Sequence, residues 1–127
     1  ASHLLLEARM ALLLQRVRLG AKAMRAGEAL EIATLGGARV LGRNDIGSLE
    51  PGKAADFVAF DLGQLEYAGA AIHDPLGALL LCAPTRCCLS VINGRVVIER
   101  GEITGFDLER AVHRQNEIAG QLLRASS

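Results

Sequence analysis

The chain has 127 residues, the size of one modest domain, and its 14 Lys and Arg residues balance its 14 Asp and Glu residues. A net charge of zero gives no long-range field for nucleic acid or an anionic membrane, and an aromatic content of 3% excludes stacking platforms for single-stranded nucleic acid. The apolar fraction of 50% favours a piece of a larger body, or a subunit that buries surface against a partner. The longest apolar runs fall well short of the ~20 residues of a membrane span.

The first predicted element is a helix over residues 2–24, with Ser2 as its N-cap. Apolar residues cover most of its circumference and leave only two narrow polar stripes. A helix that is apolar on two sides must be covered on two sides, and a chain this short has little with which to cover it. We therefore expect exposed apolar surface and self-association of the isolated chain.

A second helix is predicted from about Gly27 to Leu41. Gly36 and Gly37 lie within it, and such small residues lower helix propensity, so we expect close packing against a neighbour as compensation. Gly42 follows as the residue that ends the helix.

Residues 45–61, "DIGSLEPGKAADFVAFD", predict a short strand at Ile46–Leu49, a tight turn and a second strand over 56–60. Pro51-Gly52 fits the two central positions of a type II turn. Lys53 is expected to extend from the turn into water. Because no nucleophile, metal or cofactor pattern lies nearby, we interpret the segment as scaffold rather than as a site.

The next elements are a loop over residues 62–73 and a short helix that Asp74 caps, with Pro75 in its first turn. This helix is expected to stop at Pro84.

The clearest local signal follows in "CLSVINGRVVIERG", where two strands flank Asn93-Gly94, the favoured pair for a type I′ hairpin. Asp107 then caps a last helix that carries one apolar stripe over about four turns.

His3, His73 and His113 share no metal-ligand spacing, and a zinc site needs three or four ligands. We place His3 in the first turn of a helix, His73 in a loop and His113 in the last helix, and interpret all three as surface or capping residues.

Cys82, Cys87 and Cys88 form no C-x-x-C pattern and are interpreted as buried, reduced thiols of a cytoplasmic protein. Glu28 and Glu31 are assigned to a solvated helix face. No residue is assigned a catalytic, cofactor-binding or metal-binding role.

Three blocks together carry a family resemblance: "EALEIATLGGARVLG", "IGSLEPGKAADFVAFD" and "CLSVINGRVVIERGEI". In order and spacing they resemble the C-terminal portion of the amidohydrolase superfamily. Within it, the chain is most similar to the cytosine-deaminase-like branch, in particular to 8-oxoguanine deaminases and hydroxyatrazine-type triazine hydrolases.

The resemblance implies a (β/α)8 barrel that holds a divalent metal, zinc or iron, and a small β-sandwich built from both ends of the chain. The chain would then be an α+β fragment. Residues 1–42 would be the last helices of the barrel, 43–105 the C-terminal share of the sandwich with an inserted helix near 74–83, and 106–127 a closing helix.

The activity implied by the resemblance is hydrolytic deamination of a purine, pyrimidine or triazine by metal-activated water. The family's H-x-H pair, its two further histidines and its metal-binding Asp have no match here, and Ala1 would fall just after that Asp. The resemblance therefore predicts a C-terminal portion that is inert alone. Its partner would be the missing N-terminal part, and only the whole enzyme would bind the heterocycle. The alternative is an independent non-catalytic module that packs against a partner or itself.

Overall fold

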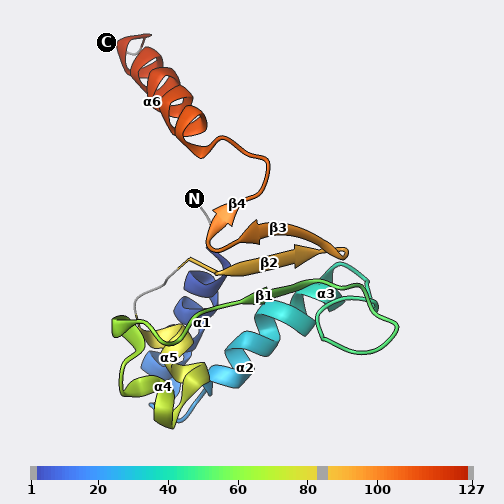
Figure 1. Ribbon diagram of the computed structural model, residues 1–127. Helices are drawn as coiled ribbons and strands as arrows, with labels where there is room; N and C mark the ends of the chain where they lie inside the picture. Colours follow the sequence, from blue (N-terminus) through green and yellow to red (C-terminus); the bar gives the residue numbers. More distant parts are fainter. Residues whose placement is uncertain (1–2, 83–85, 126–127) are drawn as a thin grey trace.

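A computed structural model describes residues 3–82 and 86–125 of the chain (Figure 1). In chain order the elements are α1 (Leu4–Leu19), α2 (Ala26–Glu31), the π-helical segment η1 (Ile32–Gly36), α3 (Gly37–Val40), β1 (Phe57–Ala59), the 3-10 helix η2 (Leu65–Tyr67), α4 (Ala70–His73), α5 (Pro75–Leu81), β2 (Leu89–Ile92), β3 (Arg95–Glu99), β4 (Glu102–Ile103) and α6 (Leu108–Ala125). The predicted α+β class is confirmed. The assignment of residues 1–42 to a barrel stays a prediction.

The strands form a four-stranded antiparallel sheet in the order β1-β2-β3-β4. The predicted type I′ hairpin between β2 and β3 is confirmed, because Asn93 (φ 48°) and Gly94 (φ 75°) both adopt the left-handed conformation that this turn requires. A second turn with positive φ at Arg100 and Gly101 leads into β4, a strand that the sequence analysis did not predict. The assignment of residues 43–105 to a share of a sandwich stays a prediction.

Helix α1 is shorter than predicted at its C-terminal end. It ends at Leu19 because Gly20 (φ 99°) leaves the helical region. The predicted cap Ser2 lies outside the described residues, and His3, with an extended backbone, precedes the first helical residue. The predicted second helix is confirmed as the run α2–η1–α3.

Gly42 (φ 65°) ends this second helix as predicted. Its amide donates to the carbonyl of Arg39 (3.0 Å), and the amide of Arg43 donates to the carbonyl of Ala38 (2.9 Å). These two bonds form a Schellman motif, which satisfies carbonyls that the helix end would otherwise leave free.

Two sequence predictions in the middle of the chain are wrong. Ile46–Leu49 is not a strand, because Gly47 turns there with φ 91° and its backbone packs on the second helix, where an added Cβ would lie 3.0 Å from the Cβ of Ala38. Residues 62–73 are not a loop throughout, because they contain η2 and α4. Tyr67 of η2 is fully buried. Packing therefore holds this segment in place, and the local sequence pattern does not predict that packing.

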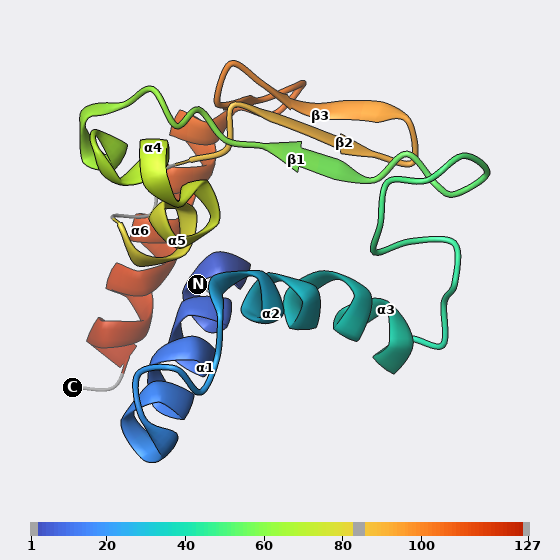
Figure 2. The same ribbon diagram turned by 90° about the horizontal axis from the view of Figure 1, so that it is seen from below.

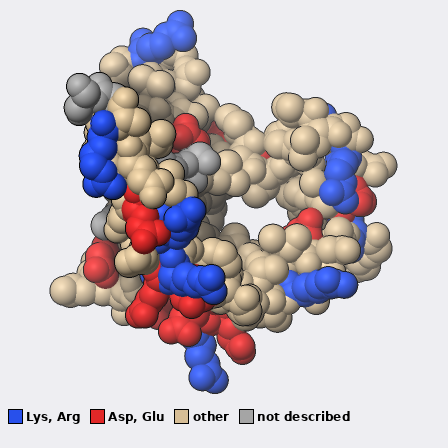
Figure 3. Space-filling model, turned by 90° about the horizontal axis from the view of Figure 1, so that it is seen from above, with Lys and Arg blue, Asp and Glu red and all other residues tan. Residues whose placement is uncertain are grey.

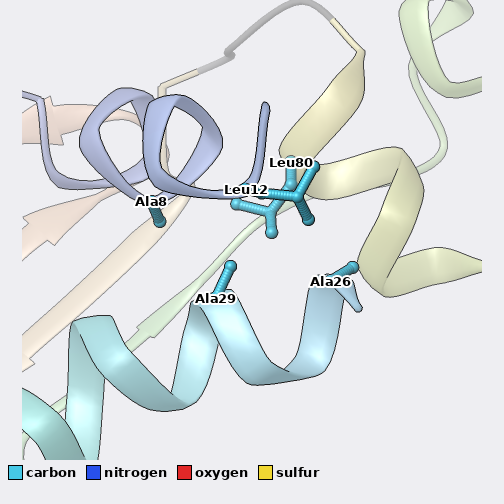
Figure 4. Close-up of a cluster of buried hydrophobic side chains, with 5 residues drawn as sticks. All are labelled: Ala8, Leu12, Ala26, Ala29 and Leu80. Atoms are coloured by element: carbon cyan, nitrogen blue, oxygen red, sulfur yellow. The ribbon is translucent and has the colours of Figure 1, made fainter. Parts of the chain in front are cut away.

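The core joins α1, α2 and α5 (Figure 4). Its buried side chains are Ala8, Leu12, Ala26, Ala29 and Leu80. Alanine on both helices allows α1 and α2 to approach closely around Leu12, which is fully buried. Many large apolar side chains stay outside this core. On α1 alone, Leu4 is 62% exposed and Val17 is 85% exposed, as the apolar circumference of that helix predicts.

Helix α6 projects beyond β4, on the side away from α1–α5 (Figure 1). Asp107 caps it as predicted, because its Oδ1 accepts from the amide of Arg110 (2.9 Å). None of its residues is buried. Among the described residues, no helix is both long enough and apolar enough to cross a bilayer.

Candidate functional site

The segment 45–61 is joined to the hairpin by two hydrogen bonds. Oδ1 of Asp56 accepts from the backbone amide of Asn93 (2.5 Å), and the carbonyl of Ala55 accepts from the amide of Gly94 (3.1 Å). The residues just before β1 therefore hold both amides of the turn between β2 and β3. This contact gives Asp56 a structural role, and the sequence analysis missed it because the partners lie 37 positions apart.

Lys53 does not extend into water as predicted. Its Nζ lies 2.5 Å from Oγ of Ser48 and 2.9 Å from Oε1 of Glu50, and its side chain is only 21% exposed. The preceding turn is closed by the amide of Lys53 on the carbonyl of Glu50 (3.2 Å), with Gly52 at φ 88°, as the predicted turn requires. Hydrogen bonds from Ser48 and then from Lys53 lower the pKa of Glu50.

Arg43 and Asp45 form a two-pronged ion pair at the start of the same segment. Nε of Arg43 donates to Oδ1 (2.9 Å) and Nη2 donates to Oδ2 (2.6 Å). These bonds lower the pKa of Asp45 and raise that of Arg43. Asp45 and Glu50 thus have partners within the segment or beside it, Asp56 has a distant one, and Oδ1 of Asp61 accepts from the amide of Gly63 (2.9 Å). These contacts account for the acids of the segment without catalysis.

The three histidines lie on separate elements. His3 precedes α1 rather than lying in its first turn, and His73 is the last residue of α4 rather than part of a loop. His113 lies in α6 as predicted, with Nδ1 3.8 Å from Oε1 of Glu117. Within residues 3–82 and 86–125, no group of three His, Cys, Asp or Glu side chains could hold a metal ion. These residues therefore do not fit the metal that the resemblance implies.

The cysteines are free thiols, but they are half-buried rather than buried as predicted. Sγ of Cys88 donates to the carbonyl of Ala59 (3.3 Å), which ties β2 to β1. Asp74 acts as the predicted helix cap, because its Oδ1 accepts from the amide of Gly77 (2.8 Å). The predicted end of that helix at Pro84 lies outside the described residues.

Glu28 and Glu31 are exposed, as expected for a solvated helix face. Oε2 of Glu28 accepts from the amide of Arg25 (2.6 Å), and Oε1 of Glu31 lies 3.2 Å from Nη2 of Arg39. Both carboxylates thus make contacts within the second helix or with the residue that precedes it.

An open apolar space separates the sheet from the second helix. Figure 2 shows the sheet and the second helix as two separate layers, and Figure 3 shows the molecule hollowed at its centre. One part of this space has a volume of about 640 Å³ and is lined mainly by apolar side chains of the segment 45–61, β1 and β2, which include Ile46, Leu49, Phe57, Val58, Val91 and Ile92. Lys and Arg are interspersed with Asp and Glu over the face in Figure 3, so charge marks no separate site there.

Comparison with known families identifies the chain. The model of the amidohydrolase family matches residues 2–97. The chain belongs to this family. The matched range includes the segment 45–61 and the hairpin, the two regions that Asp56 joins.

Two curated relatives of this family member are similar in sequence. It is 46% identical to an 8-oxoguanine deaminase of Pseudomonas aeruginosa over 97% of its own length and 27% of the relative's. It is 48% identical to a hydroxydechloroatrazine ethylaminohydrolase of Pseudomonas sp. strain ADP over 61% of the chain and 16% of the relative.

Two solved structures share its fold. An adenosine deaminase of Xanthomonas campestris with bound zinc superposes with a TM-score of 0.86 and 33% identity, covering 94% of this chain and 28% of that one. An atrazine chlorohydrolase of Arthrobacter aurescens TC1 complexed with zinc gives a TM-score of 0.81 and 36% identity, covering 89% and 25%. The chain spans about a quarter of the length of the 8-oxoguanine deaminase.

Proposed function

We propose that the chain is the C-terminal quarter of a metal-dependent amidohydrolase that hydrolytically deaminates an N-heterocycle of the purine or triazine type. The observation that carries the proposal is the 46% identity with an 8-oxoguanine deaminase, which runs through nearly the whole chain but only 27% of that enzyme. The role of these residues is to complete and stabilise the enzyme. The metal ligands and the groups that move protons belong to the part outside this chain.

Two structural features support this division of labour. The described residues offer no cluster that could hold a metal, although the two similar solved structures carry zinc. The space between the sheet and the second helix is open and apolar, and its lining leaves Val58 50% exposed and Ile92 56% exposed, which suits an interface with further protein. The three free thiols fit a reducing, cytoplasmic compartment.

A chimeric protein, called the joined protein below, tests the proposal. In it, this chain replaces the matching 27% of the Pseudomonas aeruginosa 8-oxoguanine deaminase. We expect the joined protein to bind zinc and to release ammonia from 8-oxoguanine, because the chain supplies the structural quarter and the relative supplies the chemistry. A joined protein that folds and binds zinc but deaminates neither 8-oxoguanine nor a hydroxylated aminotriazine would contradict the proposal.

The 127-residue chain by itself provides the matched control. We expect it to bind no stoichiometric zinc and to release no ammonia from either compound, because its described residues lack a ligand cluster. We also expect it to self-associate and to bind a dye for exposed apolar surface. Metal-dependent turnover by the chain alone would show that it carries its own site.

A further inference from the structure

Helix α6 carries an apolar stripe that no described residue buries. The stripe consists of Leu108, Val112, Ile118 and Leu122, whose exposed fractions range from 37% for Ile118 to 66% for Leu122. The sequence places these residues on one face, about four turns long. An amphipathic helix of this kind owes its stability in proteins mainly to the burial of that face.

The opposite face of α6 is polar and is satisfied within the helix. Nη1 of Arg114 lies 3.2 Å from Oε2 of Glu117, and Nδ1 of His113 lies 3.8 Å from the other oxygen of the same carboxylate. Such pairs at spacings of three and four residues suit a solvent-facing surface. The apolar stripe is therefore the face of α6 that remains to be buried by a partner.

The comparisons show that α6 is shared with longer proteins. The family model ends at residue 97, before α6, but the match with the 8-oxoguanine deaminase covers 97% of the chain and so includes most of this helix. The adenosine deaminase structure superposes over 94% of the chain with a TM-score of 0.86. Most of α6 is thus matched in proteins of which nearly three quarters lies outside the match and could cover the stripe.

We propose that the apolar stripe of α6 docks on the part of the same polypeptide that lies outside this chain, and so fastens the C-terminal quarter to the catalytic part. This inference rests on the proposed function. A second copy of the chain is the weaker candidate, because a helix of 18 residues is about 27 Å long and ~10 Å wide and presents only about 270 Å². A stable dimer buries about 800 Å² per partner, whereas contact within one polypeptide avoids the entropy cost of association.

Hydrogen exchange of the α6 amides tests the docking directly. We expect the amides of Ala111–Ala125 to exchange rapidly in the isolated 127-residue chain and roughly 100-fold more slowly in the joined protein, because burial of the stripe suppresses local opening. A joined protein in which α6 gains no protection overturns the proposal. So does an isolated chain in which α6 is already protected in a dimer that dissociates on dilution.

A matched pair of double variants assigns the protection to the stripe. V112E/L122E places two carboxylates on it, whereas N116E/Q121E places two on the polar face with similar helix propensity. We expect the first variant to lose the protection in the joined protein and the second to keep it. Equal protection in both variants would show that the stripe is not the docking surface.

These readouts separate the docking from the proposed function. Protected α6 amides without deamination would leave the docking standing and remove the proposed activity. Deamination with unprotected α6 amides would support the proposed activity and remove the docking.

Discussion

The hairpin region and helix α6 are both well formed locally, but they differ in what surrounds them. The turn between β2 and β3 is held by Asp56 and Ala55 from a distant segment, and Val91 of β2 is buried. Helix α6 has its cap and its internal ion pairs, yet buries no residue. The comparison shows that local rules form an element, whereas contacts from elsewhere decide whether its apolar face is covered. The largest expected effects therefore lie where such contacts exist.

The core around Leu12 provides the strongest test. In the joined protein, Leu12→Ala should lower the free energy of unfolding by about 2–5 kcal/mol, because the side chain is fully buried and its removal leaves a cavity. Urea unfolding measures the loss. The matched control is Val17→Ala on the same helix, which is 85% exposed in this chain. A cost for Val17→Ala equal to that for Leu12→Ala would show that the other side of α1 is covered as well.

Removing the carboxylate of Asp56 tests the link between the segment 45–61 and the hairpin. In the joined protein, Asp56→Ala should cost about 1.5–3 kcal/mol, the range for a hydrogen bond to a charged group. Asp56→Asn should lose less, because its amide oxygen can still accept from Asn93. Hydrogen exchange should show faster opening of the Asn93 and Gly94 amides in the alanine variant. Unchanged exchange there would mean that the hairpin needs no support from β1.

Gly52 tests the turn that precedes β1. Gly52→Val in the joined protein should cost about 1–3 kcal/mol, because φ 88° is a strained conformation for a β-branched residue, although the space around an added Cβ is open. Gly52→Asn should cost less, since Asn tolerates positive φ. Thermal unfolding of the two variants gives the comparison. Equal stability of Gly52→Val and the parent would count against strain at this turn.

The smallest effect is expected at the Ser48–Glu50–Lys53 group. The pKa of Glu50 is lower in the folded protein than in the unfolded chain, so its contribution to stability is present above the unfolded pKa and is lost as the pH falls through the folded pKa. Glu50→Gln should flatten the pH dependence of Tm in that acidic range. A profile that Glu50→Gln leaves unchanged would argue against this contribution.

Lys53 tests the interpretation of the segment as scaffold. Lys53→Ala in the joined protein should leave turnover per folded molecule unchanged, because the ammonium contacts Ser48 and Glu50 rather than a cluster that could hold a metal. Steady-state kinetics on protein of verified folded fraction measure this. A sharp fall in kcat would make the segment part of a site.

Elements that depend on neighbours in the sequence were predictable. The Asn93-Gly94 turn, the Asp74 and Asp107 caps, the end of the second helix at Gly42 and the positive φ of Gly52 all follow from local backbone preferences. The three blocks of resemblance likewise led to the family that the comparison shows.

Only the tertiary structure decided the rest. Gly47 is not part of a strand, because its backbone packs on Ala38. Tyr67 is buried within a stretch predicted to be a loop. Lys53 contacts Glu50 instead of extending into water. The bond from Asn93 to Asp56 joins positions that no periodicity connects. The physical reason is that backbone preference and periodicity limit what a segment can adopt, whereas burial and side-chain hydrogen bonds select one conformation. Their partners lie outside any periodic pattern, from Ser48 and Glu50 for Lys53 to Asn93 for Asp56.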